Sequence, residues 1–179
     1  WSSDVCSSDL FCTLVLINGT NFLDGINTLV IGYYLIITLL LITLINNFNL
    51  VFDIEILNIL SLTLIIVFIF NFFGKLYLGD SGSYVLSFFI GSLLISLVNN
   101  NSIVSPYFIA LLLWYPAFEN LFSIIRKKIN RIPSSTPDNN HLHQLLFVFF
   151  NKFIKNKNIS NTTTGLIINM YNLLIFLIS

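Results

Sequence analysis

The chain has 179 residues, of which 56% are hydrophobic and only 9% are charged, and its mean hydropathy is +0.88. Soluble domains carry about 25% charged residues, so this composition excludes an ordinary soluble domain and predicts a membrane protein. The formal net charge is zero, and without a basic stripe nucleic acid is not an expected partner.

The first ten residues, WSSDVCSSDL, match the translation of a common sequencing-adapter sequence. We interpret residues 1–10 as an adapter artefact and leave them out of fold reasoning; the alternative is a polar N-terminal tail. Residues 11–179 are then expected to be the C-terminal part of a single transmembrane domain. The two cysteines, Cys6 and Cys12, have a spacing typical of neither a zinc site nor a disulfide framework.

Apolar stretches separated by short polar ones follow from residue 11 onward. A bilayer core of about 30 Å requires roughly 20 apolar residues in a helix. The sequence therefore predicts an all-α, polytopic membrane helix bundle of about five transmembrane helices plus a partial one. The predicted spans are Phe11–Ile17 (the end of a span), Thr28–Ile45, Ile54–Phe73, Ser83–Val98, Pro106–Ile125 and Gly165–Ser179 (incomplete or tilted). Residues 142–154 are expected to form either an amphipathic helix at the membrane surface or a loop that dips into the membrane.

Alternation of the spans divides the polar segments between two membrane faces. One face receives residues 18–27, 74–82 and 126–164, and the other receives residues 46–53 and 99–105. All eight Lys and Arg residues fall in the first group, which the positive-inside rule assigns to the cytoplasm.

Acidic residues are few, and ionisable groups at membrane depth are costly and tend to mark sites. The segment N-G-T-N-F-L-D-G contains Asn18, Asn21, Asp24 and Gly25 just before a predicted span. Closely spaced carboxylate and amide oxygens suit a divalent cation or a phosphate–sugar ligand, and Gly25 would allow a sharp turn beside Asp24. The alternative is a polar loop whose aspartate caps the next helix.

A second polar segment, G-K-L-Y-L-G-D-S-G-S, covers residues 74–83. Asp80 is a single carboxylate between glycines at the mouth of an apolar helix, which is typical of a metal or phosphate cradle with inward-pointing backbone N–H groups. Lys75 would contact a phosphate as a point charge. The alternative is a membrane turn in which Asp80 caps the helix.

The third polar segment joins the basic run Arg126–Arg131 to P-D-N-N-H-L-H at residues 137–143. His141 and His143 are the only histidines in the chain, and at i, i+2 they would not share a helix face. This spacing excludes a two-histidine zinc helix and favours an extended or looped pair that faces an anionic ligand, with Asp138 orienting a ring. For the lysines of the basic run, a membrane-anchoring role is the simpler interpretation.

Together these motifs resemble the polyprenyl-phosphate N-acetylhexosamine-1-phosphate transferase family, glycosyltransferase family 4. The resemblance rests on the N-x-x-N-x-x-D-G, G-D-x-G-S and D-x-x-H-x-H motifs, on their order and on the number of spans between them, and it covers residues 11–179. The H-L-H form is similar to the branch that includes the WecA and TagO enzymes. The phospho-MurNAc-pentapeptide transferase branch carries a histidine triplet instead.

The resemblance implies transfer of N-acetylhexosamine 1-phosphate from a UDP-sugar to undecaprenyl phosphate, with release of UMP. This is the first lipid-linked step of cell-envelope glycopolymer synthesis, at the cytoplasmic face of the bacterial inner membrane. The implied cofactor is Mg²⁺ or Mn²⁺. The implied partners are UDP-N-acetylhexosamine, undecaprenyl phosphate, the lipid bilayer and a second copy of the chain in a homodimer.

The resemblance also implies roles for single residues. Asp80 would be the main metal ligand, and Asp24 would contribute to the metal or diphosphate site as the second catalytic residue. The implied substrate-binding residues are Asn18, Asn21, Gly25, Arg126, His141 and His143. The asparagines would line the nucleotide pocket, the histidines would bind phosphate oxygens or the sugar, and the arginine would neutralise the diphosphate.

Three departures from the family pattern affect these expectations. Asn27 stands where many relatives repeat an aspartate, and Glu119 stands in a span where an aspartate is usual. The paired aspartates that relatives carry in an earlier cytoplasmic loop are absent, so this chain alone is expected to be inactive.

Two alternatives to a transferase stay open. The first is a transporter or channel fragment, in which ionisable residues at the membrane midplane would form a pathway, although here the acids cluster at loop ends. The second is a catalytically degenerate relative. A CDP-alcohol phosphotransferase is excluded, because its pattern requires Ala-Arg soon after Asp-Gly and Gly25 is followed by Ile-Asn-Thr.

Overall fold

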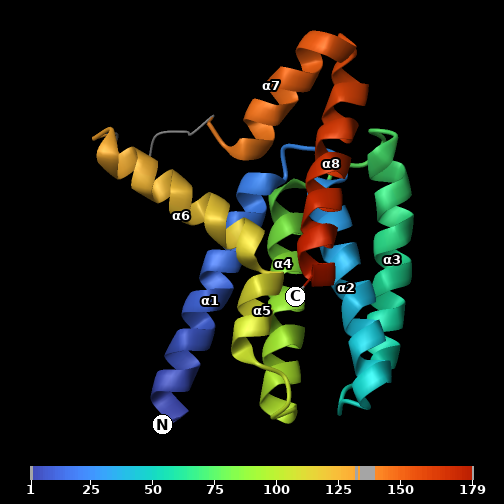
Figure 1. Cartoon of the computed structure of the whole chain (residues 1–179), viewed down its shortest axis with the longest axis vertical. Coiled ribbons are helices and arrows are strands. Elements are labelled where there is room, and N and C mark those ends of the chain that lie inside the picture. Colours follow the sequence, from blue (N-terminus) through green and yellow to red (C-terminus); the bar gives the residue numbers. More distant parts are fainter. Residues whose placement is uncertain (1, 132, 134–139, 179) are drawn as a thin grey trace.

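A computed structural model describes residues 2–131, 133 and 140–178 of the chain. The regular structure of these residues is helical, without strands, which confirms the predicted all-α class. The helices are α1 (Ser2–Leu23), α2 (Leu29–Phe48), α3 (Ile54–Phe72), α4 (Gly79–Asn100), α5 (Pro106–Leu112), α6 (Trp114–Ile129), α7 (Leu142–Ile154) and α8 (Lys157–Ile178) (Figure 1).

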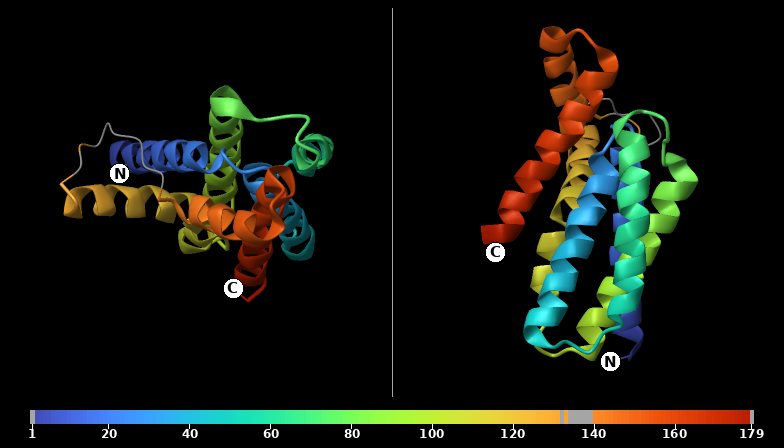
Figure 2. Two further views of the ribbon diagram at one scale, coloured as in Figure 1. Left: turned by 90° about the horizontal axis from the view of Figure 1, so that it is seen from above. Right: turned by 90° about the vertical axis from the view of Figure 1, so that its right-hand side faces the viewer.

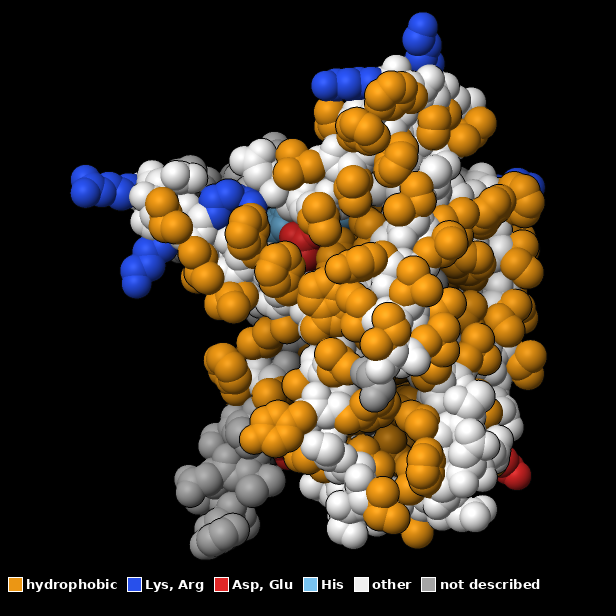
Figure 3. Space-filling view, in the orientation of Figure 1, with side chains coloured by type: hydrophobic (Ala, Val, Ile, Leu, Met, Phe, Trp, Pro, Cys, Tyr) orange, Lys and Arg blue, Asp and Glu red, His pale blue; other side chains and the backbone are white. Residues whose placement is uncertain are grey.

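Four of the described helices, α2, α3, α4 and α8, are long and apolar enough to cross a membrane, and α5 with α6 would make a fifth span if the bent pair is one crossing. This number confirms the prediction of about five spans. Apolar side chains cover much of the surface in Figure 3, as expected where lipid rather than water surrounds the helices. The artefact interpretation of the first ten residues stays a prediction; α1 runs through them from Ser2.

Two predicted helix boundaries are wrong. The segment predicted as a polar loop from Asn18 is helical as far as Leu23. The last span begins at Lys157 rather than at Gly165, because the hydroxyls of its polar first half bond inside the protein. One of them, the Thr164 hydroxyl, donates to the backbone carbonyl one turn earlier at 2.8 Å.

The structure breaks the predicted span Pro106–Ile125 into α5 and α6, which differ in direction by 72°. Pro116 is the cause: proline has no N–H for the carbonyl four residues earlier, and its ring crowds that carbonyl. The carbonyl belongs to Leu112, and it accepts a hydrogen bond from the Tyr33 hydroxyl of α2 instead. As a result α6 leans outward past α1 (Figure 1).

The helices pack in a few strong pairs. α1 contacts α4 and α6, α2 contacts α3 and α8, and α7 contacts α8. α2 supplies much of the core, and its buried side chains include Tyr33, Tyr34, Ile37 and Leu41. The histidine-bearing α7 and the polar end of α1 therefore belong to different helix pairs.

The connecting loops gather at two opposite ends of the bundle, as the sequence predicts (Figure 2). At one end, the Asn101 side chain bonds to both the N–H and the carbonyl of Val51, at 2.8 and 3.2 Å, and so joins two loops. At the other end, the Thr28 N–H donates to Asn71 of α3, and the Asn169 amide of α8 donates to the Thr28 carbonyl. The second end carries the predicted site residues.

Candidate active site

Asp24 and Asp80, the acidic pair, lie close together at the N-terminal end of α4. Asp24 is in the turn between α1 and α2, and Asp80 is in the first turn of α4. Burial raises the pKa of Asp24 to about 6; a hydrogen bond from the Gly79 backbone opposes this shift, and the charge of Asp80 adds to it. Two carboxylates that are distant in the sequence thus repel each other at the N-terminal end of α4, and a cation bound between them would relieve this repulsion.

The left-handed backbone of Gly79 turns the chain into α4 beside Asp24. Its φ is +67°, a conformation that glycine adopts without the steric cost that a side chain would bring. The same turn places the Gly79 N–H against the Asp24 carboxylate. The glycine-containing segment was predicted to surround Asp80 alone, but it also contacts Asp24, which comes from a different segment. Both aspartates therefore lie at the N-terminus of α4, where the helix dipole favours negative charge.

Asn21 connects the end of α1 to the acidic pair. Its Oδ1 lies 3.1 Å from the Ser83 hydroxyl, which is also 2.9 Å from the Asp80 carbonyl oxygen. Ser83 was not among the predicted site residues, although it ends the G-D-x-G-S motif. Asn18 is exposed one turn earlier on α1, on the same helix face as Asn21.

Gly25 lies in the turn that follows α1, as predicted, but without the left-handed backbone that would require a glycine there. A Cβ at Gly25 would meet nothing within 4 Å, and among the described glycines only Gly74 and Gly79 have a left-handed φ. The left-handed residue of this loop is Thr28, with φ 68°, an outlier for a β-branched residue. Its hydrogen bonds to α3 and α8 hold it there, so these two helices, rather than a glycine, fix the loop that presents Asp24.

Asn27 is buried under α8. Its backbone N–H donates to Asn161 Oδ1 at 2.9 Å, and a Cβ on Gly165 would lie 2.1 Å from the Asn27 carbonyl oxygen. Sequence reasoning missed this contact because it placed the start of the last span at Gly165. The close approach shows that α8 supports the Asp24 loop directly.

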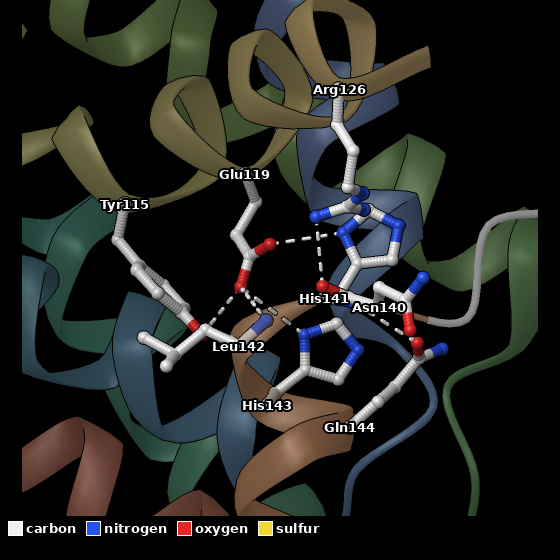
Figure 4. Close-up of polar contacts among 8 residues, drawn as sticks. All are labelled: Tyr115, Glu119, Arg126, Asn140, His141, Leu142, His143 and Gln144. Carbon is white, nitrogen blue, oxygen red and sulfur yellow. Dashed lines mark hydrogen bonds and ion pairs between the residues drawn. The ribbon is translucent and has the colours of Figure 1, made fainter. Parts of the chain in front are cut away.

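The two histidines lie against a carboxylate of α6 that sequence reasoning had not placed in the site (Figure 4). Glu119 Oε2 is 2.9 Å from His141 Nδ1, and Oε1 is 3.5 Å from His143 Nδ1. Oε1 also accepts hydrogen bonds from the Leu142 backbone N–H at 3.1 Å and the Tyr115 hydroxyl at 3.2 Å. Glu119 and His143 are each 1% exposed, and His141 is 3% exposed.

The local fold of residues 140–143, the histidine segment, lets both rings face one carboxylate. His141 is the extended N-cap of α7, with ψ 150°, whereas His143 is inside the first turn. The Gln144 side chain accepts a hydrogen bond from the His141 N–H at 3.3 Å and closes a capping box. The expected extended or looped pair is therefore found for His141 only, because His143 is helical; that the pair faces an anionic ligand stays a prediction.

Arg126 holds the other side of the histidine segment. Its guanidinium donates to the Asn140 carbonyl at 2.9 Å and lies 5.2 Å from the centre of the Phe122 ring. Arg126 follows Glu119 by two helical turns and lies on the same face of α6. This face therefore contacts the histidine segment at two points. Contact of Arg126 with a diphosphate stays a prediction, and the predicted role of Asp138 lies outside the described residues.

The acidic pair and the histidine segment are joined through α1. The Phe22 ring, two residues before Asp24, stacks on His141 with 5.2 Å between ring centres. One turn earlier, α1 meets α6 so closely that a Cβ on Gly19 would lie 2.3 Å from the Pro116 carbonyl oxygen. The end of α1 therefore contacts α4 on one side and the histidine segment on the other, which brings all three polar motifs to one end of the bundle.

Two carboxylates are a donor set that suits a hard divalent cation such as Mg²⁺ better than zinc. In the part of the chain that the structure describes, no cluster of three or more His, Cys, Asp or Glu side chains is arranged to hold a metal ion. Zinc sites usually need three or four protein ligands. Mg²⁺ instead keeps several waters and commonly uses one or two carboxylates plus substrate phosphates, which matches two adjacent aspartates.

Comparisons with known proteins show which family the chain belongs to. The family described as glycosyl transferase family 4 matches residues 6–98, which contain both aspartates of the acidic pair. A Bacillus subtilis (strain 168) protein described as a probable undecaprenyl-phosphate N-acetylglucosaminyl 1-phosphate transferase is 35% identical over 99 residues, which are 51% of this chain and 28% of that protein. The chain therefore spans less than a third of this relative. No solved structure matches. On the family match, the chain belongs to glycosyl transferase family 4.

Proposed function

We propose that the protein containing this chain transfers N-acetylhexosamine 1-phosphate from a UDP-sugar to undecaprenyl phosphate and releases UMP. The observation that carries the proposal is the acidic pair at the N-terminus of α4, at the same end of the bundle as the buried histidine segment. Family membership and the printed description of the Bacillus subtilis relative support this reaction class.

The acidic pair is the proposed site of Mg²⁺, for which Mn²⁺ would substitute. Two carboxylates leave most positions of an octahedral ion to water and to phosphate oxygens of the substrate. When bound there, Mg²⁺ would neutralise negative charge on the diphosphate during transfer.

The residues of the chain would orient the reacting groups. The N-terminus of α4 directs its backbone N–H groups and its positive dipole end toward bound phosphate. Asn18 and Asn21, on one face of α1, would line the nucleotide pocket, and the histidines would bind phosphate oxygens or the sugar. An oxygen of the lipid phosphate then attacks the phosphorus attached to the sugar, in line with the bond that breaks as UMP leaves.

We further propose that the site faces the cytoplasm of a bacterial cell, at the inner membrane. Lys and Arg side chains gather toward the end of the molecule that carries the site, whereas acidic side chains appear both beside the histidine and at the opposite end (Figure 3). The positive-inside rule assigns the basic end to the cytoplasm. A homodimer and the role of the product in building a cell-envelope polymer belong to the same proposal.

Substitution of Asp80 in the full-length protein tests the reaction. We expect Asp80→Asn to lower Mg²⁺-dependent UMP release by at least about 100-fold, since several kcal/mol of charge stabilisation is lost. The matched control is Asp53→Asn, which changes an aspartate at the opposite end of the bundle and is expected to retain activity. Unchanged Mg²⁺-dependent release in Asp80→Asn would overturn the proposed function, and an inactive wild-type protein would indicate a degenerate relative.

A further inference from the structure

Glu119 is a buried carboxylate to which neither the motifs nor the proposed reaction assigns a task. Both of its oxygens are occupied: Oε2 by His141, and Oε1 by the Leu142 N–H, the Tyr115 hydroxyl and the nearby ring of His143. A carboxylate offers about four lone-pair sites, and three of them are used by hydrogen bonds from His141, the Leu142 N–H and the Tyr115 hydroxyl. We propose that Glu119 is a positioning residue that fixes the tautomer and the ring orientation of the histidine segment; the identity of the substrate in this inference rests on the proposed function.

The tautomer of His141 follows from the chemistry of its partner. An ionised carboxylate only accepts hydrogen bonds, so at 2.9 Å the proton of the bond must be on His141 Nδ1. Nε2 is then the nitrogen left to accept from, or once protonated to donate to, a ligand. In metal sites, a carboxylate that accepts a hydrogen bond from one ring nitrogen fixes the orientation of a histidine that binds through its other nitrogen.

Stacking fixes the plane of the same ring. Phe22 lies 5.2 Å from the His141 ring centre with 28° between the planes, and His143 lies 5.4 Å away with 16° between the planes. With a ring stacked against it from α1 and another from α7, and one nitrogen bonded to Glu119, His141 has little freedom to swing. Its orientation is thus tied to α1, which also carries the Asp24 loop.

His143 has an unsatisfied atom that fits this assignment. Its Nε2 is buried and has no hydrogen-bond partner within the described residues, while its Nδ1 lies near Glu119 at a distance too long for a good hydrogen bond. Buried polar atoms are nearly always paired. An oxygen of a bound phosphate or sugar would satisfy Nε2, and the charge of Glu119 would hold the ring in place for that contact.

Helix contacts also fix the position of the Glu119 carboxylate relative to the acidic pair. Glu119 follows Pro116 by one turn, and Pro116 touches Gly19 of α1. α1 then leads directly to Asp24. The path from Glu119 therefore runs through helix contacts as far as Leu23, the residue before Asp24, and helices give the rigid support that a precisely placed ligand-binding group requires.

Nitrogen NMR of histidine-labelled full-length protein in lipid nanodiscs tests the proposal at alkaline pH, where imidazoles are neutral. Single His141→Asn and His143→Asn variants assign the signals. We expect the Nδ1–H tautomer of His141 in the wild type and in Glu119→Asp, which keeps a carboxylate. Glu119→Gln presents an amide N–H₂ in place of one oxygen, so we expect His141 to change to the Nε2–H tautomer, and kcat/KM for the UDP-sugar to fall about 10- to 100-fold.

Asn120→Ala is the matched control, because it truncates the neighbouring α6 side chain, whose amide points to the Val15 carbonyl instead, at 3.5 Å. We expect this variant to keep the wild-type tautomer. An Nε2–H tautomer of His141 in the wild type would overturn the proposal. An unchanged tautomer in folded Glu119→Gln would overturn it as well. Absence of transferase activity in the wild type would overturn the proposed function alone, since the tautomer is read without turnover.

Discussion

Replacement of Gly19 by alanine tests how α1 aligns the two halves of the site. A Cβ at this position would lie 2.3 Å from the Pro116 carbonyl oxygen and 2.7 Å from its carbonyl carbon. Both are backbone atoms, so no rotamer change makes room, and α6 must retreat until the contact exceeds 3.0 Å. Because Glu119 is one turn beyond Pro116, the retreat would move the carboxylate that holds the histidines.

The expected effect on stability is smaller than the effect on activity. Overpacking costs about 1–3 kcal/mol, and alanine is favoured over glycine in a helix by about 1 kcal/mol, so the net loss in unfolding free energy is about 1 kcal/mol. A misplacement of about 1 Å in a reacting group can lower the rate about 100-fold. We therefore expect kcat to fall at least tenfold while the protein stays folded.

The assay combines thermal unfolding in detergent with UMP release by the full-length protein. Gly91→Ala is the control, because its Cβ would meet only side-chain methyl groups, of Leu16 at 3.3 Å and of Thr13 at 3.9 Å, and these side chains can adjust. Gly91→Ala should be as stable as the wild type or more so. If Gly19→Ala were as active as the wild type, the close contact between α1 and α6 would not be what aligns the site.

Three further substitutions test the support around the site. Tyr33→Phe leaves the Leu112 carbonyl without a donor at the helix break, and we expect thermal unfolding to show a loss of about 1–3 kcal/mol; an unchanged melting temperature would argue against this bond. Gly165→Ala places a Cβ 2.1 Å from the Asn27 carbonyl oxygen, so both stability and Mg²⁺-dependent transfer should fall, and wild-type values for both would contradict the packing. Asp53→Ala removes the N-cap of α3 and should cost about 1 kcal/mol without loss of transfer; loss of transfer would place Asp53 in the site.

The membrane spans and the two-ended arrangement of the loops were predictable from sequence. Long apolar runs can only be helices in a bilayer, because lipid offers no partner for backbone groups. Pro116 interrupts an apolar run, so the sequence also contains the signal for the break at Leu113. Hydropathy alone does not reveal this break, because the residues on both sides of it are apolar. The early start of α8 was not, because it depends on tertiary contacts that bury hydroxyls such as that of Thr162, which donates to the Phe72 carbonyl at 3.2 Å.

The site was predictable in its motif residues but not in how they are held. Asp24, Asp80 and the histidines stand out because polar groups are rare in this chain. Glu119 gave one signal, a charge inside an apolar span, yet its partners come from a segment 22 residues away, at His141. No signal in the sequence indicated the left-handed backbone conformation of Thr28, since only hydrogen bonds to distant helices stabilise it.

Side-specific labelling of single cysteines tests most directly whether the three polar motifs open on one membrane face. Cys6 and Cys12 are first replaced by serine, and a cysteine is placed at Ser81, Asn140 or Ser102, three exposed positions. A membrane-impermeant maleimide should reach Ser81→Cys and Asn140→Cys only from the cytoplasmic side, and Ser102→Cys only from the outside. Labelling of Ser81→Cys and Asn140→Cys from opposite sides would contradict a common site for the acidic pair and the histidines.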